Sequence, residues 1–231
     1  MGKVAGCTLT YVTSGSSSLP PLDRLPSGRH RLTREAVEES QRGRLLFATA
    51  QVVAEKGYSA ATVSDIVDRA SVSRSTFYEQ FRDKEACFVE AFNFGVEFVL
   101  GKMRAAWEAL AEDGDWRAHV RSDLKTFLQT LASEPAFARA VHIEVLAAGP
   151  AALDRRAEIF ALFTARTRRI HELARAQQPS LPELPDEVFK LHTGGMDELI
   201  REQLRTRGPE ALPELTDPLI AATLALFGDA R

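Results

Sequence analysis

The 231-residue chain lacks the features that mark several classes of protein. Its two cysteines, Cys7 and Cys87, are too few for the disulfide framework of a small secreted domain. Its longest apolar run, at residues 219–228, falls well short of the roughly 18 to 20 residues that a membrane-spanning helix needs. The first residues show no apolar segment of the kind that begins a secretion signal. These absences predict a cytoplasmic protein with no membrane partner.

Patterns typical of catalysis and of metal binding are also missing from the sequence. No histidine stands at metal-ligand spacing from another histidine or a cysteine, and there is no Gly-rich phosphate loop or nucleophile elbow. The five histidines are His30, His119, His142, His171 and His192. We therefore expect no metal, no cofactor and no enzymatic activity, with an all-α enzyme or a small-molecule carrier as the alternative.

The composition is that of an ordinary globular protein, with 45% hydrophobic and 26% charged residues. The charge is uneven: residues 1–85 carry 12 basic and 10 acidic side chains, whereas residues 86–231 carry 17 and 22. A slightly positive N-terminal part joined to an acidic remainder fits one segment that faces nucleic acid and another that does not.

Residues 1–33 are rich in Ser, Gly and Pro and end in the basic run Arg29-His30-Arg31. Such a composition predicts a disordered, basic N-terminal arm. Two interpretations stay open: a solvated tail, or an arm that lies along DNA phosphates or in a minor groove.

From residue 34 onward the sequence predicts helices throughout. Apolar residues recur at three- and four-residue spacing, and no alternating run typical of a strand occurs. Gly57, Gly114 and Gly149 stand where helices end. The sequence predicts an all-α fold of about nine helices, at residues 36–56, 63–70, 74–80, 84 onward, 116–132, 135–147, 151–177, 186–207 and 217–228.

Residues 62–81 carry the pattern that indicates a function. Thr62 and Asp65 stand at capping-box spacing, which marks a helix start. A tight turn follows, and Ser73 caps a further helix whose Phe77 faces inward. Two short helices joined by such a turn predict a helix-turn-helix. The outer face of the second helix carries hydroxyls, a guanidinium and an aromatic ring, which bind phosphates and base edges.

A capped hairpin within an ordinary helical bundle is the alternative interpretation. The wider segment carries a colinear set of residues: Lys56-Gly57-Tyr58, Thr62-Val63, Ile66-Val67, Ala70-Ser71-Val72-Ser73, Thr76-Phe77-Tyr78, Phe81 and Asp83-Lys84-Glu85. This set resembles the DNA-binding signature of the TetR family of transcriptional regulators. One departure is Ser71, where the family usually has Gly; a left-handed backbone there would cost very roughly 1 kcal/mol.

The resemblance implies a homodimer built from two kinds of domain. Residues 34–82 would form the helix-turn-helix DNA-binding domain, and residues 83–231 a ligand-binding and dimerisation domain. Two recognition helices would enter successive major grooves of a palindromic double-stranded operator, roughly 34–36 Å apart. The expected DNA-binding residues are Thr62, Ser73, Arg74, Ser75, Thr76, Tyr78, Lys84, Arg42 and Arg44.

The roles of these residues follow from their chemistry. Arg74 is the candidate base reader because arginine pairs bidentately with guanine, although a phosphate contact is the alternative. Tyr78 is expected to donate to a phosphate. Thr62 and Lys84 occupy helix N-termini, which favour an anion.

Large apolar residues after residue 83 supply a candidate effector site, since small-molecule pockets are mostly apolar with few polar groups. The expected effector-binding residues are Phe94, Phe98, Trp107, Phe127, Phe137, His142, Phe160, Phe163, His192 and Met196. The same phenylalanines could equally be core. The helices at residues 186–207 and 217–228 could form the dimer interface or pack within one subunit.

These expectations combine into a transcriptional repressor that a small hydrophobic effector releases from DNA. An activator or a dual regulator would share the same sequence features.

Overall fold

The computed structural model describes residues 34–110 and 114–229, so the predicted N-terminal arm at residues 1–33 lies outside the described residues. Within these ranges the chain forms nine α-helices, two 3-10 segments and no strand, which confirms the predicted all-α fold. The elements are α1 (Arg34–Lys56), α2 (Val63–Ala70), α3 (Arg74–Gln80), α4 (Lys84–Glu108), α5 (Trp116–Ser133), α6 (Pro135–His142), η1 (Glu144–Ala147), α7 (Pro150–Gln177), α8 (Asp186–Thr206), η2 (Pro209–Leu215) and α9 (Thr216–Leu226).

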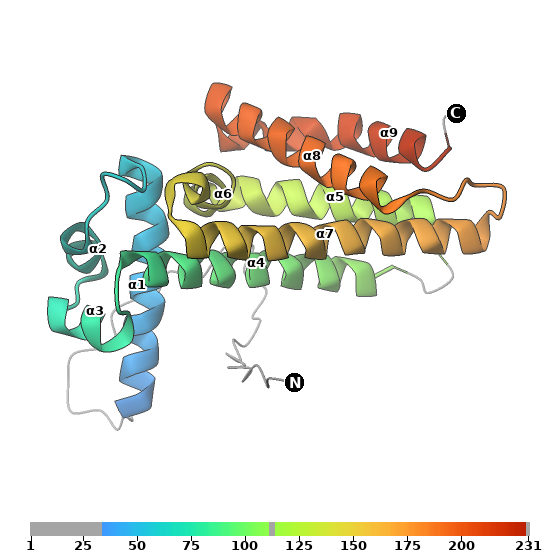
Figure 1. Cartoon of the computed structure of the whole chain (residues 1–231). Coiled ribbons are helices and arrows are strands. Elements are labelled where there is room, and N and C mark those ends of the chain that lie inside the picture. The colour runs from blue at the N-terminus through green and yellow to red at the C-terminus, as the bar shows by residue number, and fades with distance from the viewer. Residues whose placement is uncertain (1–33, 111–113, 230–231) are drawn as a thin grey trace.

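Helices α1, α2 and α3 form one end of the molecule, and α4, α5 and α7 run away from it (Figure 1). These three long helices pack on one another, with α8 against α7 and α9 against α5. The short helix α6 contacts α4, α5 and α8 in the bundle and also α1. Helix α6 therefore joins the interior of the bundle to the N-terminal helices.

Side-chain caps fix the helix-turn-helix. The Thr62 hydroxyl accepts from the Asp65 amide at 3.2 Å, and the Asp65 carboxylate accepts from the Thr62 amide at 3.0 Å. Ser73 caps α3 by accepting from the Thr76 amide at 3.0 Å. Between the helices Ser71 has φ 53°, the left-handed conformation in which a side chain is disfavoured. The expected capping box is confirmed, and Ser71 adopts the left-handed backbone on which its expected cost depends.

The structure departs from the sequence expectation at two places. The sixth helix ends at His142 rather than near residue 147, and the 3-10 segment η1 follows it. Residues 209–215, which lie between two of the predicted helices, form the 3-10 segment η2, and its Leu212 is fully buried. Pro213 inside this segment is compatible with a short 3-10 turn but would break a longer α-helix.

The core includes the one cysteine within the described ranges. Cys87 is fully buried, and its sulfur lies 3.1 Å from the Thr49 hydroxyl. Burial raises the pKa of the Cys87 thiol to about 12. A thiol with this pKa stays protonated at neutral pH, which makes it a poor nucleophile and a poor redox sensor.

No helix in the part of the chain that the structure describes is both long enough and apolar enough to cross a membrane.

Three histidines make the fold sensitive to acid. Burial lowers the pKa of His119, His171 and His192 below the ordinary value of 6.5. Below about pH 6.5 the unfolded chain therefore binds protons that the folded chain still excludes. The free energy of unfolding should fall on acidification through this range, by about 1.4 kcal/mol per pH unit for each such proton.

Denaturant unfolding at a series of pH values from about 7.5 down to about 5 measures this slope. The variant His171→Leu removes one of the three sites and should give a shallower slope. Equal stability across the whole range would contradict the prediction.

Candidate DNA-binding surface and effector cavity

Helix α3 presents a polar outer face on a buried anchor. Phe77 is fully buried, whereas Ser73, Arg74, Ser75 and Tyr78 are exposed. Tyr78 is 49% exposed, which is high for an aromatic side chain with no role in the core. The arrangement leaves hydroxyl, guanidinium and phenol donors at the surface on a helix that cannot rotate without exposing Phe77.

The exposed residues of α3 also contact one another. The Ser73 hydroxyl lies 2.7 Å from that of Ser75 and 2.8 Å from that of Thr76, which is half-buried. The Arg74 guanidinium carbon lies 5.8 Å from the centre of the Tyr78 ring. The predicted recognition residues therefore form one continuous surface, and their contact with DNA stays a prediction.

The two arginines predicted on α1 make contacts within the protein. Arg42 pairs with Glu90 of α4 and lies over the Phe81 ring, at 4.6 Å from its centre. Arg44 donates to the Ala70 carbonyl at 2.8 Å, at the end of α2. Both side chains stabilise the packing of the helix-turn-helix. If either arginine also contacted a DNA phosphate, it would do so while keeping these contacts within the protein or by breaking them.

Thr62 and Lys84 also make hydrogen bonds within the protein. The Thr62 hydroxyl also donates to Asp65, and hydrogen bonds from Lys56 and Thr62 lower the pKa of Asp65 to about 2. The Lys84 ammonium donates to the Tyr58 carbonyl at 2.7 Å and to the Ala61 carbonyl at 2.8 Å. Two of its three N–H groups are thus used, which leaves at most one for a phosphate.

A buried carboxylate joins the N-terminal helices to the bundle. Glu144 of η1 accepts from the Tyr58 amide at 2.9 Å and pairs with Arg139 at 3.1 Å. A second link runs from Glu85 at the start of α4, which accepts from the Ala151 amide at 2.9 Å. Sequence reasoning missed Glu144, because a contact between residues 58 and 144 leaves no periodic signal in either segment.

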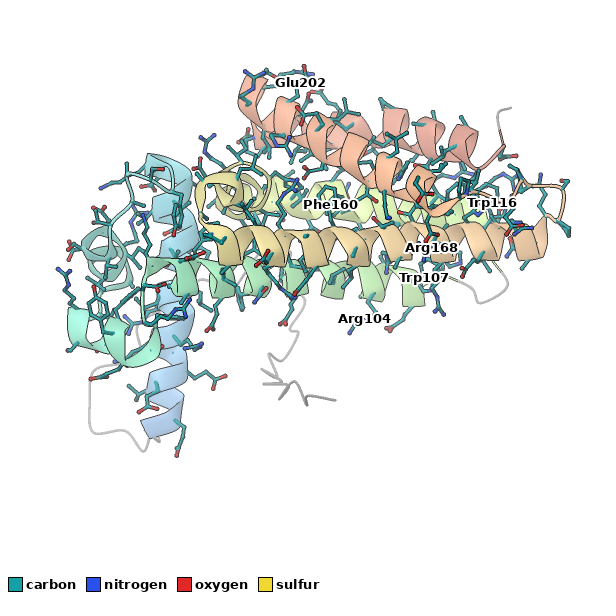
Figure 2. All side chains as sticks on the ribbon, in the orientation of Figure 1. Arg104, Trp107, Trp116, Phe160, Arg168 and Glu202 are labelled. Atoms are coloured by element: carbon teal, nitrogen blue, oxygen red, sulfur yellow. The ribbon has the colours of Figure 1, made fainter. Side chains whose placement is uncertain are left out.

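The bundle encloses a cavity of about 60 Å³ between α4, α5, α6, α7 and α8. Apart from a few polar residues at one corner, its walls are aliphatic and aromatic. Figure 2 shows Phe160, one of the lining residues, in the middle of the bundle. Of the predicted effector-binding residues, the cavity brings together Phe127, Phe137, His142, Phe160, Phe163 and Met196.

The other predicted effector residues lie away from this cavity. Trp107 stacks on His119 with ring centres 4.0 Å apart, near the end of the bundle farthest from α1–α3 (Figure 2). Phe94 and Phe98 are only half-buried, because the face of α4 that points into the bundle carries Phe92, Val96 and Val99 instead. His192 bonds to the Thr223 hydroxyl at 2.8 Å and lines a neighbouring cavity of about 30 Å³.

A charged cluster forms the polar corner of the larger cavity. Asp197 of α8 accepts from His142 Nδ1 at 2.7 Å and from Arg156 at 2.6 Å, and it also pairs with Arg201. Burial alone would raise the pKa of Asp197, but the hydrogen bond from His142 and the charges of the two arginines bring it below its ordinary value. Asp197 lies in the buried phase of α8, a signal that sequence reasoning overlooked.

Neither cavity has the donor set of a metal centre. Across residues 34–110 and 114–229, no three His, Cys, Asp or Glu side chains are grouped so that they could hold a metal ion.

Comparison with known proteins gives a family match in the segment that contains the helix-turn-helix. Residues 45–91 match the sequence profile of the bacterial regulatory proteins of the tetR family. Over 105 residues the chain is 29% identical to the HTH-type transcriptional activator FasR of Mycolicibacterium smegmatis, a stretch that covers 46% of this chain and 47% of FasR. The chain thus matches about half the length of this curated relative.

Two solved structures share the fold over most of both chains. The fatty acid degradation regulator FadR of Bacillus halodurans superposes with a TM-score of 0.69 at 21% identity, covering 80% of this chain and 98% of its own. FadR of Bacillus subtilis, solved in complex with stearoyl-CoA, gives 0.68 at 18% identity, with coverage of 82% and 99%. At these identities the likeness establishes the fold alone.

Proposed function

We propose that this chain, which belongs to the TetR family of bacterial regulatory proteins, acts as a dimeric repressor released from a palindromic operator by a small, mostly apolar effector. The observation that carries the proposal is the outer face of α3, where Arg74 and Tyr78 stand exposed on a helix that the buried Phe77 anchors. Residues 34–82 would bind DNA, and residues 83–231 would bind the effector and the second subunit.

The cavity volume supports a link between effector binding and helix movement. About 60 Å³ is less than half of the roughly 150 Å³ that admits benzene in an engineered apolar cavity. A larger effector must therefore push the walls apart. One wall is α6, which also packs on α1. Two residues after α6 ends, Glu144 accepts a hydrogen bond from the Tyr58 amide. Displacement of α6 would shift the recognition helices.

The required energies are modest. An effector that binds the DNA-incompetent arrangement better by about 3 kcal/mol would weaken operator binding roughly 150-fold. The relative FadR, solved with stearoyl-CoA, supports a largely apolar effector. A transcriptional activator is the second candidate function, and the identity to FasR favours it.

The proposal is tested by selecting DNA that binds the purified protein from a random pool. An inverted repeat should emerge, and its binding should weaken steeply as salt rises, because lysine and arginine contacts release counterions from the phosphates. Failure to enrich any repeat would rule out an operator-binding regulator.

Replacing Arg74 with alanine should weaken binding to the selected repeat by about 1–3 kcal/mol, because the bidentate contact to a base is lost. The fold should be unaffected, since Arg74 is exposed. Titration of repeat and random DNA measures the effect, with Arg121→Ala, an exposed arginine of α5, as the control. Equal losses on both DNAs would make Arg74 a phosphate contact instead.

A further inference from the structure

Two buried nitrogen atoms at the polar corner of the larger cavity have no hydrogen-bond partner among the described residues. They are Nε2 of His142 and Nε of Arg156, and both side chains line the cavity. His142 is only 6% exposed. A buried polar group without a partner costs about 1–3 kcal/mol, so a ligand that supplies one gains that amount.

Asp197 determines what these two atoms can bind. Its carboxylate takes the His142 Nδ1–H and one terminal N–H of Arg156, and so orients both groups. The Arg156 guanidinium carbon also lies 4.4 Å from the centre of the Phe160 ring, which holds its plane. Arg156 Nε–H can only donate, and His142 Nε2 donates when the ring is protonated. An oxygen acceptor satisfies Arg156 Nε–H in either state of the ring; with the neutral ring His142 Nε2 accepts instead, and a hydroxyl or acid proton on the same head group would satisfy it.

The apolar walls define the rest of the ligand. The smaller cavity of about 30 Å³ shares Phe127, Phe163 and Met196 with the larger one. A slender chain that parts these three side chains would extend from the polar corner into the second space. A broad ring system would have to part more of the surrounding walls than a slender chain does.

We propose that the two cavities together bind an amphipathic ligand with an unbranched apolar chain and a carbonyl or carboxylate head, the head at Arg156 and His142 and the chain past Phe163. This proposal deepens the effector role proposed above and rests on it. The Arg156 side chain is 23% exposed, so a group attached to the carbonyl can reach solvent. A free acid and an ester or thioester therefore present the same chemistry to the site.

The test compares three probes that share one ten-carbon chain: decanoate, decanoyl-coenzyme A and decylammonium. Calorimetric titration of the full chain should show the acceptor-headed probes binding roughly 10- to 100-fold more tightly than decylammonium, which can only donate and is repelled by Arg156. The stronger of the two acceptor-headed probes identifies the source of the ligand. Equal binding of decanoate and decylammonium, or no binding of any probe, would overturn the proposal.

Paired variants locate the head group. Arg156→Met should remove the preference for acceptor-headed probes, because it weakens their binding and also relieves the repulsion of decylammonium. Arg201→Met is the matched control, because Arg201 also pairs with Asp197 but does not line the cavity; it should keep the preference. Arg156→Lys retains a positive charge beside Asp197 without Nε–H, and it provides a folded variant should the methionine variant unfold. If the Arg156 and Arg201 variants lost equal amounts of affinity for the acceptor-headed probes, the preference would come from the overall positive charge of the cluster and not from a head-group contact with Arg156.

The outcome for the site is separable from that for the proposed function. Tight binding of decanoate without any change in operator affinity would retain the site and reject its role as the effector switch. Operator binding by a protein that binds neither acceptor-headed probe would retain the regulator and reject the site.

Discussion

Replacing Leu191 and Leu199 with aspartate is expected to turn the proposed dimer into monomers and to weaken operator binding by roughly 100- to 10,000-fold. The large effect arises because a dimer places two recognition helices on linked half-sites, so that the second contact is made within one complex. A monomer keeps the same α3 surface but loses this advantage.

The exposed face of α8 supplies the reason for choosing these residues. Leu191 is 75% exposed and Leu199 42% exposed, and they lie two helical turns apart with Gly195 between them. A Cβ added at Gly194 or Gly195 would meet nothing within 4 Å, so the subunit leaves room there for a partner helix. The nearby exposed residues of α9 are small: Ala221, Ala222 and Ala225.

Phe227 is unsuited to such a test, although the apolar sequence of the last helix points to it. It is fully buried within the subunit, with its ring centre 4.8 Å from that of His171 and 5.9 Å from that of Trp116. A charge at Phe227 would unfold the bundle, whereas one at Leu191 enters a position that is already solvated in the single chain.

Light scattering gives the mass, and operator titration gives the affinity. Leu162→Asp on α7 is the control, because Leu162 is 42% exposed and lies on a different helix. If this control alone became monomeric, the interface would lie on α7; a dimer that survives both sets of changes would place it elsewhere.

Replacing Gly95 with alanine should destabilise the protein by about 1–3 kcal/mol, the usual cost of forcing extra carbon into a packed core. Gly95 lies where α4 crosses α6, and an added Cβ would come within 1.7 Å of the Phe137 ring. Phe137 is buried and lines the cavity, so its ring can move only into that space or with α6. The melting temperature should fall by roughly 2–4 °C per kcal/mol for a chain of this size.

The same helix offers a matched control with the opposite sign. A Cβ added at Gly101, an exposed residue of α4, would meet nothing within 4 Å. Gly101→Ala should therefore stabilise the protein by up to about 1 kcal/mol, the intrinsic preference of a helix for alanine. Differential scanning calorimetry of both variants decides the matter. A Gly95 variant as stable as the Gly101 variant would mean that the α4–α6 crossing relaxes without cost.

Local chemistry allowed the helix-turn-helix to be predicted from the sequence. The Thr62 and Ser73 caps involve residues only a few positions apart, so spacing alone reveals them. The start of α6 at Pro135 follows from the same kind of signal, since proline is favoured in the first helical turn. The left-handed backbone at Ser71 is expected from the resemblance to the TetR family, which usually has Gly there.

The cavity walls and the charged cluster could not be predicted in this way, because they depend on contacts between residues far apart in the sequence. Phe94 and Phe98 have the right composition for a cavity wall, but the packing of α4 turns Phe92, Val96 and Val99 inward instead. The cluster around Asp197 joins residues from α6, α7 and α8, whose separation along the chain hides their proximity. Its one sequence signal is an acidic residue at a buried position of an amphipathic helix.

The two-residue step from His142 to Glu144 bears on how this scaffold can be adapted. His142 lines the cavity, while Glu144 accepts a hydrogen bond from the Tyr58 amide, so a cavity wall and a contact to the N-terminal helices lie within a single turn of backbone. Phe160 and Thr193 line the cavity from α7 and α8, outside the segment from His142 to Glu144. Under the proposed effector role, substitutions at these positions would alter ligand preference without changing that segment, which would make the chain a suitable starting point for designed biosensors.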